Sequence, residues 1–190
     1  MLTDRVEPQW IDSFERVLRL CKAAPDEPVC ILAESQSRAL NLDLAELALR
    51  RIGCRPFRVT VPTPPQTAPV PVRSTGASRA LQGHPGALAA MAASPFVLDM
   101  TLEGLLHAPE LPQILKAGSR VLMISNEHPE ALERLTPDPA LEPRVKAAVK
   151  RARAARRMTV TSAAGTDLVV DMAGATTVGA GTLALTGTGQ

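Results

Sequence analysis

Short apolar runs alternate with amphipathic segments along most of this chain. We expect strands at residues 28–34, 57–61, 95–101 and 120–125, and helices at residues 8–23, 40–52, 85–93, 113–117, 129–135 and 141–156. The first run, PVCILAE, is apolar up to its last residue, which is typical of a strand that is buried on both faces of a parallel sheet. The alternation predicts an α/β fold with a Rossmann-like, mostly parallel sheet flanked by helices.

The pattern changes near residue 157. Residues 157–163 and 167–172 are separated by a short turn that contains Gly165, and they predict an antiparallel hairpin. We therefore expect a Rossmann-like α/β domain over residues 1–156. Over residues 157–190 we expect the hairpin and a tail rich in Gly, Thr and Ala, which together form the truncated start of a second, β-rich domain. A proline-rich segment, residues 62–73, is expected to be a flap beside the sheet edge because proline cannot pair within a central strand.

Composition excludes several classes of partner. Aromatic residues make up 2% of the chain and the net charge is +2, which argues against a stacking platform for nucleic acid. No uncharged apolar run approaches the roughly 20 residues of a membrane span, and the N-terminus has no signal-peptide pattern. We expect no nucleic-acid or membrane partner and a cytoplasmic protein. Its three cysteines form no C-x-x-C pair, so we expect reduced thiols.

One histidine follows a predicted strand directly. The run 95–101 leads into a loop that holds Leu106 and His107. In open α/β sheets, ligands gather where loops leave the carboxyl ends of strands. An imidazole changes protonation near neutral pH, so His107 is a candidate general acid or base. The alternative is a surface histidine with no chemical role.

The other polar candidates have simpler interpretations. Asn126 or Glu127 is expected to cap the helix that follows, with His128 beside it, and His84 is expected in an exposed turn. The histidines are too widely spaced to predict a metal site made by this chain alone. Ser35 and Ser37 are expected to cap the helix over residues 40–52, with anion binding as the alternative. The basic residues between 144 and 157 are expected on the solvated face of a helix whose other side is a buried stripe.

Six stretches of the sequence carry a resemblance to a known family. They are FERVLRLC at 14–21, VCILAES at 29–35, VTVPT at 59–63, VLDMTLEGLLH at 97–107 with QILKAGSRVL at 113–122, and RMTVTSAAGTD at 157–167. In this order and spacing they resemble the N-terminal domain of the 2,5-dihydroxypyridine 5,6-dioxygenase family, which is related to the M29-type leucyl aminopeptidases. The resemblance covers residues from about 10 to 170.

The resemblance implies a function. Such enzymes use Fe(II) and O₂ to open 2,5-dihydroxypyridine between C5 and C6, giving N-formylmaleamate, a step of nicotinate degradation. Carried over, it implies that His107 faces this small aromatic substrate as acid/base and that Leu106 acts as a gate. The family's iron ligands lie in a C-terminal domain, so we expect this chain to stop before them, to hold no iron tightly and to be inactive alone.

Two alternatives stay open beside the dioxygenase. The chain is either a fragment of an M29-like leucyl aminopeptidase, whose two divalent metals would bind beyond it, or a non-catalytic assembly module. In each case a homo-oligomer is expected, because half of a two-domain enzyme exposes the surface that its partner domain would cover.

Overall fold

The computed structural model of the protein describes residues 5–65, 76–124, 126–135 and 138–175. By their internal contacts these residues form two compact units, which meet in the sequence at residues 136 and 137. This division falls one helix before residue 157, where the sequence analysis places the start of a second domain. The domain boundary at 157 therefore stays a prediction, and each unit is described by itself.

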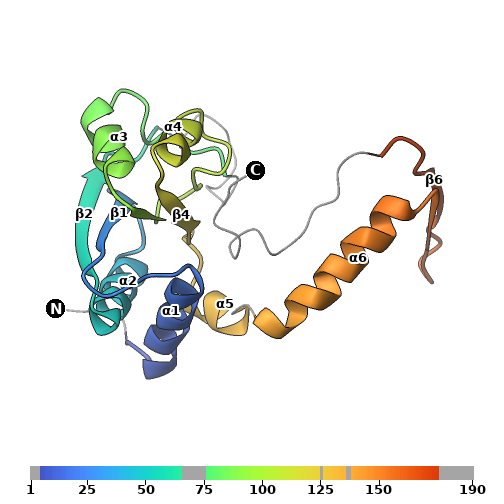
Figure 1. The fold of residues 1–190 in the computed structure, drawn as a ribbon, viewed down its shortest axis with the longest axis horizontal. Coiled ribbons are helices and arrows are strands. Elements are labelled where there is room, and N and C mark those ends of the chain that lie inside the picture. Colours follow the sequence, from blue (N-terminus) through green and yellow to red (C-terminus); the bar gives the residue numbers. More distant parts are fainter. Residues whose placement is uncertain (1–4, 66–75, 125, 136–137, 176–190) are drawn as a thin grey trace. The chain divides into compact units, whose positions relative to one another are not determined.

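The first unit is built on a parallel sheet of four strands, as Figure 1 shows. The strands are β1 (Pro28–Glu34), β2 (Arg55–Val61), β3 (Phe96–Asp99) and β4 (Arg120–Met123), in the order β2-β1-β3-β4. Its helices are α1 (Pro8–Leu20), α2 (Ala39–Ile52), α3 (Pro85–Ala92), α4 (Leu111–Lys116) and α5 (Pro129–Arg134). The predicted α/β fold is confirmed, and β1 has the bounds predicted for it.

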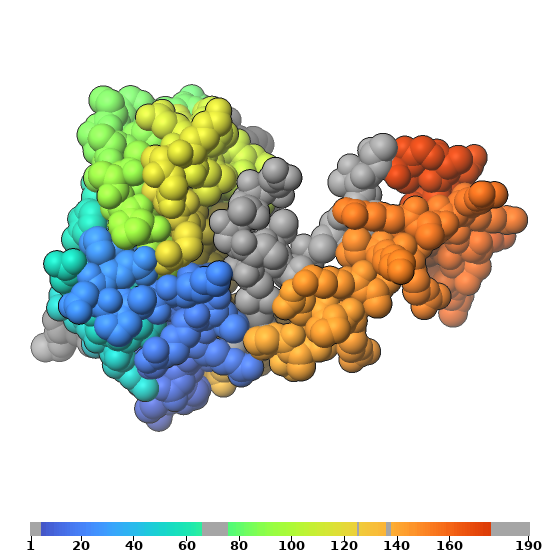
Figure 2. All heavy atoms as spheres, in the orientation of Figure 1, coloured from blue at the N-terminus to red at the C-terminus, as the bar shows by residue number. Residues whose placement is uncertain are grey.

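Helices cover both faces of the sheet. Ile31 and Leu98 point into a core formed with α1 and α2, whose central side chains include Phe14 and Leu44. Leu32, on the opposite face, packs with Met91 of α3 and Ile114 of α4. Figure 2 shows the atoms of α3 (green) beside those of α4 (yellow). Successive residues of β1 thus enter different cores, which explains why the run is apolar on both faces.

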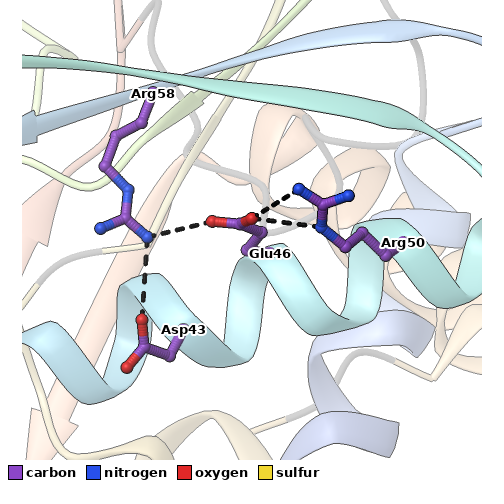
Figure 3. A network of polar contacts seen from close by, with 4 residues as sticks. All are labelled: Asp43, Glu46, Arg50 and Arg58. Carbon is purple, nitrogen blue, oxygen red and sulfur yellow. Dashed lines mark hydrogen bonds and ion pairs between the residues drawn. The ribbon is translucent and has the colours of Figure 1, made fainter.

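The edge strand β2 carries a charged side chain that pairs with acidic residues of α2. Arg58 lies 3.3 Å from Glu46 and 3.8 Å from Asp43, both on α2, and Glu46 also pairs with Arg50 at 2.8 Å (Figure 3). Because these groups are well exposed, each pair adds at most about 1 kcal/mol to stability. A charged side chain on an edge strand also hinders pairing with a strand of another chain.

In the second unit, none of the described residues 138–175 is buried. It holds a short 3-10 helix (Pro139–Leu141), α6 (Glu142–Ala154), β5 (Arg157–Thr161) and β6 (Asp167–Asp171). β5 and β6 pair antiparallel, which confirms the predicted hairpin. The predicted buried stripe on α6 is wrong: none of its residues is buried, although Val145, Val149 and Ala152 are half-buried.

Two sequence predictions fall largely on residues outside this description. They are the proline-rich flap, of which residues 66–75 are not described, and the tail beyond residue 175. Within the described residues, no helix has the length and apolar character that crossing a bilayer requires.

Truncation of Leu98 tests the central position of β3. Leu98 is fully buried, so we expect Leu98→Ala to lower the free energy of unfolding by about 2–5 kcal/mol. Leu47→Ala is the control, because Leu47 lies on α2 with 44% of its surface exposed. Urea unfolding of both variants gives the comparison, and equal losses would contradict the assigned core.

Candidate functional site

At the carboxyl edge of the sheet, the chain leaves the parallel strands β1 and β3 toward opposite faces. These strands are neighbours in the sheet, yet α2, which follows β1, packs on one face and α4, which follows β3, packs on the other. The loops after the two strands therefore leave in opposite directions. This is the position at which open α/β sheets form their ligand crevice.

Two buried carboxyl groups end the two strands. Glu34 is the last residue of β1 and is 3% exposed, and Asp99 is the last residue of β3 and is fully buried. Leu32 pairs with Asp99 in the sheet, so by strand alternation Glu34 lies on the same face as Asp99. Buried acidic side chains require hydrogen-bond donors, and both groups have them.

Asp99 is bonded by the loop that follows it, residues 100–110, which we call the His107 loop. Its Oδ1 accepts hydrogen bonds from the Thr101 backbone N–H at 3.0 Å and the Thr101 hydroxyl at 2.7 Å, and its Oδ2 accepts from the Leu105 N–H at 2.7 Å. Burial raises the pKa of the Asp99 carboxyl, while these hydrogen bonds act in the opposite direction. The Thr101 oxygen in turn accepts from the Gly104 N–H at 3.0 Å.

Leu106 and His107 project from this loop. Leu106 is 59% exposed and His107 is also exposed, whereas Leu105 and Ala108 on either side of them are buried. Among the described residues, no side chain hydrogen-bonds the His107 ring. The loop thus presents an apolar side chain and an imidazole side by side at the carboxyl edge.

A second segment, residues 76–78, lies well before this loop in the sequence and is hydrogen-bonded to it. The Gly76 N–H donates to the Glu103 carbonyl at 2.5 Å, the Ser78 N–H donates to the Gly104 carbonyl at 2.8 Å, and the His107 N–H donates to the Gly76 carbonyl. Gly76 has a φ of +74°, and a methyl group there would stand 2.9 Å from Leu106 Cβ and 3.2 Å from His107 Cδ2. Both the conformation and the space at this position require glycine.

Ser78 connects this segment to β1. Its hydroxyl donates to Glu34 Oε1 at 3.2 Å and accepts from the Ala80 N–H at 3.1 Å. Burial is the main cause that raises the pKa of the Glu34 carboxyl, and the charge of Asp99 adds to it, while hydrogen bonds from Ser78, Leu102 and Thr63 lower it.

The loop also contacts β4. Gly104 has a φ of +79°, and a methyl group there would overlap the sulfur of Met123, the last residue of β4. The His107 loop is therefore held by residues at the ends of three strands.

The serines after β1 do not cap α2, contrary to the sequence prediction. The Ser37 hydroxyl accepts from the Glu34 N–H and donates to the Met100 carbonyl, each at 2.8 Å, so it joins the ends of β1 and β3. The Ser35 hydroxyl bonds Thr63 instead. Residues 63 and 76, which flank the part of the proline-rich segment outside the description, are thus both bonded to loops at the carboxyl edge.

The predicted cap of α5 is also wrong. His128 occupies that position and its Nδ1 accepts from the Glu130 N–H at 3.4 Å, while its ring packs edge-on against Trp10 at 5.1 Å. Asn126 serves α2 instead, because its Oδ1 accepts from the Arg38 N–H at 2.7 Å. His84 precedes α3 and is half-buried rather than exposed. The three histidines lie in separate loops.

The arrangement does not fit a metal centre within the described residues. No group of three or more His, Cys, Asp or Glu side chains among them is placed to hold a metal ion. Asp99 uses both oxygens on its own loop, and Glu34 is bonded by Ser78. Within the described residues, this edge of the sheet therefore presents an exposed imidazole near two buried carboxyl groups and brings no metal-ligand set together.

The raised pKa of Glu34 makes a pH-dependent prediction for Glu34→Gln. A carboxyl whose pKa is higher in the folded state favours folding below its unfolded pKa of about 4.3, and this contribution is lost as the pH rises through the folded value. The glutamine variant lacks this loss. We expect the stability of wild type relative to Glu34→Gln to fall as the pH rises above the unfolded pKa of about 4.3. Urea unfolding at several pH values measures it, and a constant difference would contradict the assignment.

Gly76→Ala tests the contact with Leu106 and His107. The left-handed conformation alone costs an alanine about 1–2 kcal/mol. Gly83→Ala is a matched control, because Gly83 has a φ of +79° and open space around it. We expect a larger loss of stability for Gly76→Ala, with NMR shift changes at Leu106 and His107 that Gly83→Ala does not cause. Equal losses and unchanged shifts would refute the contact.

Comparison with known proteins bears on most of the chain. A family model described as NicX, 2,5-dihydroxypyridine 5,6-dioxygenase, matches residues 9–188. The 2,5-dihydroxypyridine 5,6-dioxygenase of Pseudomonas putida KT2440 is 32% identical over 161 residues, which are 84% of this chain and 45% of that protein. A solved structure of 2,5-dihydroxypyridine dioxygenase from the same organism is similar with a TM-score of 0.72 at 32% identity, covering 88% of this chain and 48% of the other. The chain spans about half the length of these relatives, and it belongs to the 2,5-dihydroxypyridine 5,6-dioxygenase family.

Proposed function

We propose that this chain supplies the substrate-facing part of a dioxygenase that cleaves 2,5-dihydroxypyridine. The observation that carries the proposal is the His107 loop: it exposes Leu106 and His107 at the carboxyl edge of the sheet, while the residues on both sides of the pair are buried. Family membership supplies the substrate class, because the relatives are named for this compound.

His107 is the proposed acid/base. Its imidazole can accept the proton of a ring hydroxyl and later return it, and it is held at a backbone position fixed by Gly76. Leu106, beside it, is the proposed gate, since an exposed leucine next to the imidazole would cover an aromatic ring and exclude water from it.

The proposal places Fe(II) and its ligands in the part of the family fold that lies outside the described residues, since those residues bring no ligand set together. A small aromatic substrate and O₂ are then the partners, in a cytoplasmic step of nicotinate degradation. The family match favours this function over an M29-like aminopeptidase and over a non-catalytic assembly module.

A homo-oligomer is also proposed. Apolar side chains of the hairpin are exposed, among them Met158, Val160 and Leu168, and exposed apolar surface of this kind is typical of a protein interface. Light scattering of the purified protein tests it, and a monomer at all concentrations would exclude it.

The key test is His107→Ala in the native protein that contains this chain, purified at its natural length. We expect kcat for 2,5-dihydroxypyridine to fall by about 10²–10⁴-fold, because a positioned acid/base contributes that much. Loss of substrate absorbance and O₂ uptake measure the rate. His84→Ala is the control, since His84 lies in a different loop before α3.

Unchanged turnover in His107→Ala would refute the assigned role. Hydrolysis of leucine anilide by the wild-type protein, without ring cleavage, would instead support the aminopeptidase.

A further inference from the structure

The hydrogen-bond donors to the Asp99 carboxyl group all belong to the His107 loop. The Thr101 N–H, the Thr101 hydroxyl and the Leu105 N–H belong to the loop that carries His107. Asp99 is fully buried at the end of a central strand, so its carboxyl group is fixed by the sheet. It follows that this one side chain bonds two separate points of the loop, Thr101 and Leu105, to the rigid part of the fold.

The last of these donors lies next to the exposed pair. The Leu105 N–H bonds Asp99 Oδ2 at 2.7 Å, and Leu105 is followed directly by Leu106 and His107. The Leu105 side chain is buried in the core beneath α3 and α4. Leu105, which precedes the pair, is thereby fixed twice: its backbone N–H bonds Asp99 and its side chain packs in the core.

We propose that Asp99 is a positioning residue, whose carboxyl group sets the loop so that Leu106 and His107 face the substrate. This inference rests on the proposed function, because it concerns the site that His107 forms. Asp99 touches no reacting atom and acts only through the Thr101 and Leu105 donors.

The chemistry of the side chain explains why an acid occupies this position. Both oxygens of Asp99 accept, one from Thr101 and the other from Leu105. An asparagine of the same shape has one oxygen and one amide nitrogen, and the nitrogen can only donate. In one orientation the amide nitrogen would face the Leu105 N–H, and in the other it would face the Thr101 N–H. Because two donors cannot bond each other, the loop would lose its hydrogen bond to residue 99 at either Leu105 or Thr101.

The first test is structural and needs no catalysis. The position that a Gly76 methyl would occupy lies 3.2 Å from His107 Cδ2, so the ring proton of His107 is close to a Gly76 α-proton. In the 190-residue chain we expect a nuclear Overhauser contact between these protons in wild type. We expect Asp99→Asn to lose this contact and to speed hydrogen exchange at the Leu105 amide by about tenfold or more.

The second test is kinetic and uses the native protein that contains this chain. A misplaced acid/base lowers the rate of the chemical step more than it weakens substrate binding. We expect Asp99→Asn to lower kcat by about tenfold to a hundredfold, with a much smaller change in KM.

Thr101 provides a matched pair of variants. Thr101→Val keeps the shape but removes the hydroxyl that bonds Asp99 and Gly104, so we expect the same changes as in Asp99→Asn. Thr101→Ser keeps the hydroxyl, so we expect it to keep the Overhauser contact and the kcat of wild type. If Asp99→Asn does not fold, Thr101→Val decides. Retention of the Overhauser contact and of kcat in the folded variants would overturn the proposal.

The failure of this inference is distinguishable from that of the proposed function. Unchanged turnover in His107→Ala refutes the function, while the Overhauser contact still reports whether Asp99 orients the ring. Loss of turnover in His107→Ala together with full activity in Asp99→Asn refutes the positioning role alone.

Discussion

The burial of β1 between two strands and two helical layers is the constraint on which the first unit depends. β1 pairs with β2 on one side and with β3 on the other, and its side chains alternate between the two cores. A strand in this position has no face toward water, so helices must cover both sides of the sheet. Since α2 follows β1 on one face and α4 follows β3 on the other, the loops after these two strands leave the carboxyl edge in opposite directions.

The side chains at this edge of the sheet divide into two kinds. Glu34 and Asp99 are buried and bonded to backbone or hydroxyl donors, whereas Leu106 and His107 face outward. Bonds at buried carboxyl groups are strong because water does not compete for them. The buried groups therefore hold the backbone at this edge, while the proposed acid/base, His107, faces outward.

The sequence was sufficient for the fold, and it predicts the loop after β3 in which His107 lies. β1 has its predicted bounds because both faces are apolar, and His107 was identified because it follows a strand end directly. The role of His107 stays a prediction. Asp99 is not among the site residues predicted from the sequence, although an Asp two residues before Thr101 is a pattern that favours a turn bonded through the side chain. Nothing near Gly76 in the sequence indicates its contact with His107, because that contact joins segments about thirty residues apart and depends on a left-handed backbone.

The contacts of the His107 loop come from different parts of the chain, and this has a consequence for how the site responds to substitution. Gly76 lies after the proline-rich segment, Met123 ends β4, and Asp99 ends β3. Each contact limits the loop in a different direction: Gly76 bonds the His107 backbone, Met123 lies against Gly104, and Asp99 holds Leu105. Changes at residues in contact with one shared element are not additive. The orientation of His107 is therefore a property of the whole carboxyl edge, and a loop transplanted without Gly76 and Met123 would not keep it.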